Sequence, residues 1–168
     1  NGNTIQAECD LEKNNIQIGG HQYSLLQFHF HATSEHLING QYYPMEVHLV
    51  HRMDKSHEKD IDPALEDTPE PEHYAVVGVM IKEGKENPLI RDLWSKIPDT
   101  KEAPIHYFIK GENVSAFLPP EGKRSYYRYN GSLTTPPCSE NVLWTVMSEP
   151  SEFSKEQIET FTNLYRNN

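Results

Sequence analysis

The alternation of apolar and polar residues along the chain predicts a series of short β-strands. Side chains alternate between the two faces of a strand, so a period of two indicates a strand with one buried face. Such strands are expected over residues 4–9, 16–18, 23–32, 46–52, 105–109, 125–129 and 141–147. The first two are expected to form an antiparallel meander. Residues 74–81 are almost all apolar, which predicts a central strand buried on both faces.

Helical spacing of apolar residues occurs in two places. Four apolar residues between Leu89 and Trp94 predict a short helix over 88–96. A second helix is expected over 154–165, because Ser154 is a good N-cap and Gln157 completes a capping box. Asn39-Gly40 is a strong signal for a two-residue hairpin turn. The chain shows no repeat, so we expect one strand-rich domain with two short helices.

Composition excludes some classes of function. The 168 residues carry a net charge of −10, and we see no basic patch of the kind that binds nucleic acid. No run approaches the roughly 20 apolar residues of a membrane span. The polar start, Asn1 to Thr4, does not resemble a signal peptide, although a processed or truncated product would look the same. Residues 53–73 are acidic and contain three prolines, which predicts a solvated loop with exposed His57 and His73.

Histidines on two neighbouring strands predict a metal site. His29 and His31 share one strand face, while Phe28 and Phe30 point to the other. His48 lies on the strand after the Asn-Gly turn, where pairing can bring it opposite the first two. Three imidazoles with an open fourth position are typical of catalytic zinc. Imidazole also suits copper, iron and nickel, so the ligands alone do not decide the metal, and zinc is the best match.

Two residues are candidates to support these histidines from behind. A metal-bound imidazole normally donates its other ring N–H to an acceptor. Gln27 precedes His29 by two residues and Glu46 precedes His48 by two, so each shares a strand face with its histidine. The alternative for each residue is an ordinary place on the strand surface.

The residues around these histidines resemble the α-class carbonic anhydrase family. The matching segments are Gln27-Phe28-His29-Phe30-His31, Ser34-Glu35-His36, Glu46-Val47-His48-Leu49-Val50-His51, Gly131-Ser132-Leu133-Thr134-Thr135-Pro136-Pro137-Cys138 and Asn141 to Thr145. The resemblance runs across essentially all 168 residues. It implies a mainly β (α+β) domain built around a large, twisted, mostly antiparallel sheet with a few short helices.

The resemblance also implies a role for each matching residue. His29, His31 and His48 hold one zinc ion. Thr134 accepts a hydrogen bond from zinc-bound hydroxide and passes its own proton to Glu35, which orients the hydroxide toward carbon dioxide. Tyr129 joins the hydrogen-bond network behind Thr134, and Thr135 contacts bicarbonate or inhibitors at the pocket mouth. The apolar pocket for carbon dioxide is lined by Val50, Val76, Leu133, Val142 and Trp144.

The activity implied is reversible hydration of carbon dioxide to bicarbonate and a proton. Sulfonamides and anions are the expected inhibitors, and no oligomeric state is indicated. Two alternatives stay open from the residues alone. One is a catalytically silent relative that serves as a binding or structural domain. The other is a zinc-dependent ester hydrolase, which we expect only as a side activity because no suitable general acid is present.

The chain departs from the family pattern at the proton-shuttle position and at both ends. The fastest members have a histidine where this chain has Asn3, so we expect slower, buffer-dependent turnover, with His21 as a poorly supported substitute. The family's N-terminal aromatic cluster and its C-terminal Arg-Pro segment have no match in residues 1–168. The resemblance places the backbone acceptor for the second nitrogen of His31 in that C-terminal segment.

The two cysteines bear on localisation. In secreted members the cysteine that matches Cys138 pairs with one in the N-terminal stretch, and Cys9 does not match that partner. We therefore expect no Cys9–Cys138 bridge. The cysteine after Thr-Thr-Pro-Pro favours a secreted or periplasmic protein.

Overall fold

The computed structural model describes residues 5–9, 14–54, 73–96, 107–109 and 114–165. The side chains of Cys9 and of residues 107–109 are outside that description. Its elements are β1 (Gln6–Cys9), β2 (Asn15–Ile18), β3 (His21–His31), β4 (Met45–Met53), β5 (Tyr74–Glu83), α1 (Pro88–Trp94), β6 (Tyr107–Ile109), the 3-10 helix η3 (Val114–Phe117), β7 (Tyr126–Ser132), β8 (Glu140–Met147), β9 (Ser151–Phe153) and α2 (Lys155–Leu164).

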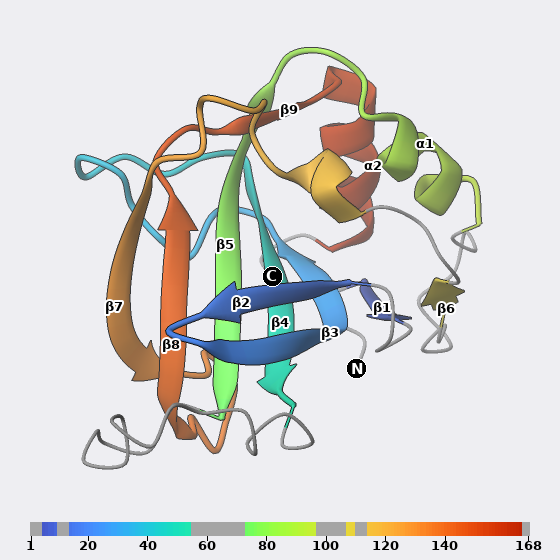
Figure 1. Cartoon of the computed structure of the whole chain (residues 1–168). Coiled ribbons are helices and arrows are strands. Elements are labelled where there is room, and N and C mark those ends of the chain that lie inside the picture. The colour runs from blue at the N-terminus through green and yellow to red at the C-terminus, as the bar shows by residue number, and fades with distance from the viewer. Residues whose placement is uncertain (1–4, 10–13, 55–72, 97–106, 110–113, 166–168) are drawn as a thin grey trace.

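The described strands form one nine-stranded mixed sheet (Figure 1). Its order is β6-β1-β3-β4-β5-β8-β7, with β2 paired to β3 and β9 paired to β5. Most pairs are antiparallel, as predicted, while β1/β6, β5/β8 and β5/β9 are parallel. The antiparallel pairing predicted for the first two strands is confirmed, but the meander order is wrong, because β1 lies beside β3 and not beside β2 in the described sheet. Both β1 and β2 pair with the long strand β3, at different positions along it, because β3 is long enough to bind two short partners.

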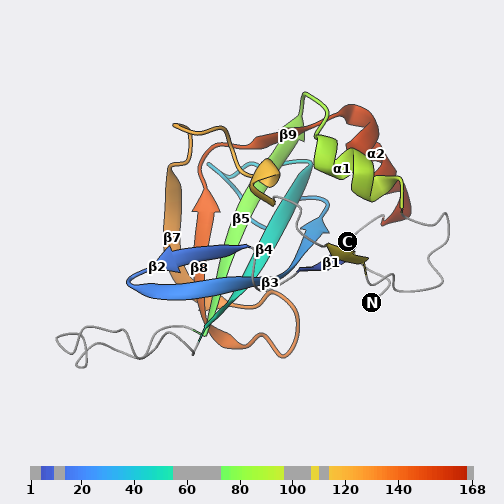
Figure 2. The ribbon, with the colours of Figure 1, turned by 45° about the vertical axis from the view of Figure 1, so that its right-hand side comes forward.

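The sheet has two differently covered faces. One face packs under α1, α2 and η3, which lie together at one end of the sheet (Figures 1 and 2). There Phe28 and Phe30 of β3 make ring contacts with Phe117, and Phe30 also contacts Phe161. The other face carries the histidines and a second apolar cluster. β5 is a central strand of the sheet. It is buried from Ala75 to Ile81, as its apolar run predicted.

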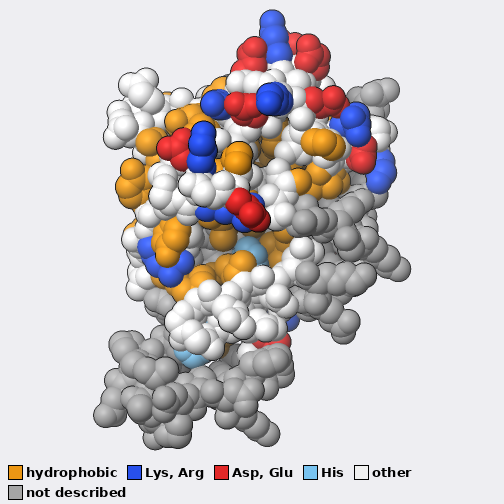
Figure 3. Space-filling model, turned by 45° about the horizontal axis from the view of Figure 1, so that its top comes forward, with side chains coloured by type: hydrophobic (Ala, Val, Ile, Leu, Met, Phe, Trp, Pro, Cys, Tyr) orange, Lys and Arg blue, Asp and Glu red, His pale blue; other side chains and the backbone are white. Residues whose placement is uncertain are grey.

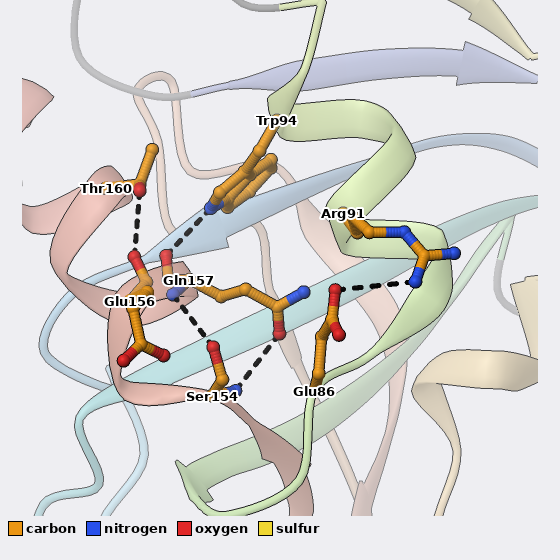
Figure 4. A pocket seen from close by; sticks show the side chains of 7 residues that line it. All are labelled: Glu86, Arg91, Trp94, Ser154, Glu156, Gln157 and Thr160. Atoms are coloured by element: carbon orange, nitrogen blue, oxygen red, sulfur yellow. Dashed lines mark hydrogen bonds and ion pairs between the residues drawn. The ribbon is translucent and has the colours of Figure 1, made fainter.

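The two predicted helices are present and are tied to each other. α2 begins with the predicted capping box between Ser154 and Gln157. The side-chain amide of Gln157 also accepts a hydrogen bond from the backbone N–H of Asn87, at 3.0 Å, and donates to its carbonyl, at 2.8 Å. Trp94 of α1 donates its indole N–H to the Gln157 carbonyl at 2.7 Å (Figure 4). The side chains around these contacts line an open groove of about 410 Å³ beside the start of α2.

Some expectations were met only in part. Asn39-Gly40 forms the expected turn, with both residues at positive φ, but it is flanked by a single bridge between Ile38 and Gln41 rather than by regular strands. His73 is exposed, as predicted, while His57 and most of the acidic loop lie outside the described residues. η3 and β9 were not predicted. Within the described ranges, no helix is long and apolar enough to cross a membrane.

Candidate metal centre

Strand pairing brings the three predicted histidines together. β3 and β4 run antiparallel, and His29 of β3 lies directly opposite His48 of β4. His31 follows two residues later on the same face of β3. One nitrogen from each ring lies within 4.8 Å of the others. The ring centroids are 4.7 to 5.2 Å apart. In the space-filling view, histidine surface is visible between hydrophobic side chains (Figure 3).

The hydrogen bonds of these rings fit a metal bound between them. His29 Nδ1 lies 2.9 Å from Gln27 Oε1, and His48 Nε2 lies 2.8 Å from Glu46 Oε1, so both predicted supporting contacts are present. His29 Nε2 and His48 Nδ1 are left as possible ligand atoms. His31 Nε2 is buried and has no hydrogen-bond partner among the described residues. A buried ring nitrogen without a partner is unfavourable, and a metal ion would supply one.

Burial keeps two of the rings in the form that binds metal. Burial, followed by the nearby rings of His48 and His31, lowers the pKa of His29 to about 3. Burial and the neighbouring His48 likewise lower the pKa of His31 below its ordinary value. Both imidazoles are therefore neutral near pH 7, with a lone pair available for a metal.

Glu46 is a fully buried carboxylate held by four donors. Its Oε2 accepts the backbone N–H groups of Glu35 and His36, both at 2.9 Å. Its Oε1 accepts from His36 Nδ1 at 2.6 Å and from His48 Nε2 at 2.8 Å. Burial raises the pKa of Glu46, but the hydrogen bonds from His36 and His48 outweigh it and bring the pKa below the usual range. A negative charge therefore lies directly behind His48.

His36 is a site residue to which the sequence analysis gave no role. Its Nε2 lies 2.7 Å from the hydroxyl of Tyr129, whose ring stacks on Trp144. Burial, with the charges of Glu46 and Glu35, raises the pKa of Tyr129 to about 12, so this phenol stays protonated. Tyr129 thus joins a network behind His48 through His36. The sequence signal that could have indicated this role is the position of His36 in Ser34-Glu35-His36, just after the strand that carries His29 and His31.

Glu35 and Thr134 are placed differently from the expected pair. The Glu35 carboxylate faces the histidines, with Oε1 3.6 Å from His31 Nδ1 and Oε2 3.9 Å from His48 Nδ1. Thr134 and Thr135 are exposed in the loop after β7. Across the described ranges, no hydrogen bond joins Thr134 to Glu35. Glu35 instead lies near Nδ1 of His31, the ring nitrogen for which a backbone acceptor was expected.

The apolar residues expected around the substrate lie beside the histidines. Val50, Val76, Val142 and Trp144 are buried in one cluster, against which Leu133 packs. The Trp144 ring lies 4.8 Å from the His48 ring, and its indole N–H donates to the Ser132 carbonyl. A buried apolar cluster therefore lies next to the His48 imidazole.

The remaining sequence candidates lie away from this centre or outside the description. Asn3 is outside the described residues. His21 is half-buried at the start of β3. Cys138 is exposed and has no disulfide partner among the described side chains, which do not include that of Cys9.

Comparison with known proteins gives one consistent match. A model of eukaryotic-type carbonic anhydrases matches residues 1–168. The chain is 36% identical to a carbonic anhydrase of Nostoc, over all of this chain and 56% of that protein. It is 37% identical to one of Klebsiella pneumoniae, over 97% of this chain and 59% of that protein. The chain thus spans less than two thirds of these curated relatives.

Solved structures match the fold as well. The α-carbonic anhydrase of Photobacterium profundum is 40% identical with a TM-score of 0.79, over 100% of this chain and 68% of that one. The enzyme of Thermovibrio ammonificans in complex with sulfanilamide is 39% identical with a TM-score of 0.78, over 98% of this chain and 64% of that one.

Proposed function

Because this chain belongs to the eukaryotic-type carbonic anhydrase family, we propose that it catalyses the zinc-dependent, reversible hydration of carbon dioxide to bicarbonate. The observation that carries the proposal is the geometry of His29, His31 and His48. Their ligand nitrogens converge within 4.8 Å, while Gln27 and Glu46 hold the opposite nitrogens of two rings. Three neutral imidazoles suit zinc and leave its charge undiminished.

Zinc bound by this site would act as a Lewis acid and make water a nucleophile near neutral pH. The protein's own residues do the rest. Gln27 and Glu46 fix the orientation of the His29 and His48 rings. The ionised Glu46 carboxylate accepts the N–H of His48, which makes the opposite nitrogen a stronger donor to a metal. These contacts set the strength and direction of metal binding.

The apolar cluster is suited to hold carbon dioxide, which has no net dipole. Val50, Val142 and Trp144 lie on the face that carries His48, so a small apolar molecule can bind beside the metal without losing hydrogen bonds. We assign Thr134, Thr135 and Glu35 to orienting the reacting groups. In support, Glu35 lies beside two of the imidazoles, and the two threonines follow Leu133 of the apolar cluster.

We further propose that product protons leave through external buffer. Asn3 has no titratable group near pH 7, so it cannot relay a proton. The expected result is that Asn3→His raises kcat in dilute buffer and changes it little in concentrated buffer. An unchanged kcat in dilute buffer would contradict this assignment of the shuttle position.

Sulfonamide binding is proposed on the same grounds. The Thermovibrio ammonificans structure is a complex with sulfanilamide, and the carbonic anhydrase Cah3 of Chlamydomonas reinhardtii, 34% identical, is a complex with acetazolamide. A sulfonamide anion would take the open ligand position between the histidines. Its ring would lie on the apolar cluster around Trp144.

The test combines zinc content with stopped-flow hydration of carbon dioxide, with and without acetazolamide. We expect one zinc per chain and hydration that acetazolamide abolishes. His48→Gln should lose both zinc and activity, whereas the matched control His73→Gln, at an exposed site, should keep both. Stoichiometric zinc without hydration would favour a catalytically silent relative. Failure of the wild-type chain to bind zinc would overturn the proposed site.

A further inference from the structure

Gly78 occupies an unexpected place for a glycine. It lies in the middle of β5, a central strand whose other residues from Ala75 to Ile81 bury apolar side chains. Glycine inside a strand is unfavourable, because it loses much conformational freedom on folding and packs no side chain. Its conformation here is not the left-handed one that only glycine adopts readily. The reason for glycine must therefore lie in the space next to it.

That space is occupied by the carboxylate of Glu46. Gly78 is the register partner of His48 on the adjacent strand β4. A Cβ atom added at Gly78 would lie 3.0 Å from Glu46 Oε1, which is tighter than nine in ten real Cβ contacts. Its next neighbours, on Trp144 and Val146, would be at ordinary distances of 3.6 and 3.7 Å. Among the described residues, the one tight contact is thus with the oxygen that accepts hydrogen bonds from His48 and His36.

We propose that Gly78 is a positioning residue of the metal centre, which acts through Glu46 on His48. The absent side chain lets Glu46 Oε1 stand where His48 Nε2 can donate to it. That hydrogen bond fixes the tautomer of His48 with the proton on Nε2, and it leaves Nδ1 free for a metal. The metal part of this inference rests on the proposed function, whereas the tautomer part does not.

The first test is the variant Gly78→Ala, examined without metal at fixed pH by ¹⁵N NMR of its histidines. In the wild type we expect His48 to carry its proton on Nε2. In Gly78→Ala the displaced carboxylate should leave a mixture of tautomers. Zinc affinity should fall by about 10- to 100-fold, as is usual when a supporting hydrogen bond to a ligand is lost. An unchanged tautomer and affinity would overturn the proposal.

A control separates this effect from simple overcrowding of the strand. Ala75→Val adds methyl groups to the same strand, but it packs against Tyr23 and Met53, away from the histidine cluster. It should lower stability while leaving the His48 tautomer and zinc affinity unchanged. If Ala75→Val disturbed them equally, Gly78 would have no special role. If the wild type failed to bind zinc, the proposed function would fall, and the tautomer comparison would still decide the role of Gly78.

A double-mutant cycle covers the case in which Gly78→Ala folds poorly. Glu46→Asp withdraws the carboxylate by one methylene and makes room for the added methyl group. Gly78→Ala should therefore shift the unfolding equilibrium less in the Glu46→Asp background, with a coupling on the order of tenfold in the equilibrium constant. Additive effects would show that Gly78 does not act through Glu46 and would overturn the proposal.

Discussion

His36 Nδ1 lies 2.6 Å from Glu46 Oε1, which ties the segment after β3 to the buried centre of the sheet. Because Glu46 is ionised, its oxygen can only accept, so the proton of this contact belongs to His36. The other ring nitrogen of His36, Nε2, lies 2.7 Å from the hydroxyl of Tyr129. A line of hydrogen bonds thus runs from the surface tyrosine through His36 and Glu46 to His48.

Replacing His36 is expected to destabilise the chain strongly. His36→Ala leaves a fully buried carboxylate without its shortest hydrogen bond, which costs about 3 kcal/mol for a charged group. Tyr129→Phe keeps the ring stacked on Trp144 and loses only the hydroxyl, so it should cost about 1 kcal/mol. Urea unfolding of the metal-free chain measures both. His36→Ala removes both contacts, so equal losses for the two variants would mean that the contact with Glu46 adds nothing to stability.

His51 is expected to make stability depend on pH. It is 3% exposed on the sheet face opposite the metal centre, with Nδ1 3.2 Å from the Ala75 carbonyl. Burial lowers its pKa to about 4, against the weaker opposite effect of the Ala75 and Leu49 carbonyls. Between about pH 6.5 and 4 the unfolded chain binds a proton that the folded chain does not. Stability should therefore fall by about 3 kcal/mol in total as the pH falls through this window.

His51→Gln tests this assignment. Glutamine can still donate to a backbone carbonyl but does not titrate. The slope of unfolding free energy against pH should therefore decrease, between pH 4 and 6.5, by the amount that corresponds to about one bound proton. The exposed His73→Gln should leave the slope unchanged. Identical slopes for His51→Gln and the wild type would place the acid sensitivity elsewhere.

Thr145 offers a stabilising substitution. It is buried in β8, and its Oγ1 has no hydrogen-bond partner within the described part of the chain. A buried hydroxyl without a partner is unfavourable by about 1–3 kcal/mol, so Thr145→Val should raise the unfolding free energy by about 1 kcal/mol. The exposed Thr160, whose hydroxyl donates to the Glu156 carbonyl, provides the control, because Thr160→Val should gain nothing. A loss of stability in Thr145→Val would indicate a partner for that hydroxyl.

Alternation was enough to predict which way the histidines face, because the period of two is a local property of the strand. It placed His29 and His31 opposite Phe28 and Phe30, and it identified Gln27 as the partner of His29. It could not predict which strands pair, because pairing depends on contacts distant in sequence. The three residues of β9 are too few to show a period, yet they pair with β5.

The same distinction separates the predicted contacts from the missed ones at the metal centre. Glu46 contacts His48 within one strand, so spacing alone predicted that contact. His36 lies in an irregular segment and reaches Glu46 only once the chain has turned back into β4. The expected contact between Glu35 and Thr134 joins two irregular segments, for which no period constrains the geometry. Short-range pattern therefore predicts which histidines share a face better than it predicts the network around them.

His31 permits a test in which stability and metal binding change in opposite ways. Its Nε2 is buried without a partner in the part of the chain that the structure describes, so the metal-free chain carries a desolvated nitrogen. His31→Leu removes that nitrogen, and we expect the metal-free variant to be as stable as the wild type or more stable. Zinc at 100 times its dissociation constant should stabilise the wild type by about 2.7 kcal/mol and His31→Leu hardly at all.

Thermal unfolding with zinc and with excess chelator measures both effects in one set of samples. His73→Gln, as a surface control, should respond to zinc like the wild type. If His31 is a ligand, the order of thermal stability should reverse between the two conditions. His31→Leu should be at least as stable as the wild type in chelator and less stable than the wild type in zinc. A variant that is weaker by the same amount in both conditions would show that His31 contributes packing alone, because loss of packing lowers stability whether or not a metal is bound.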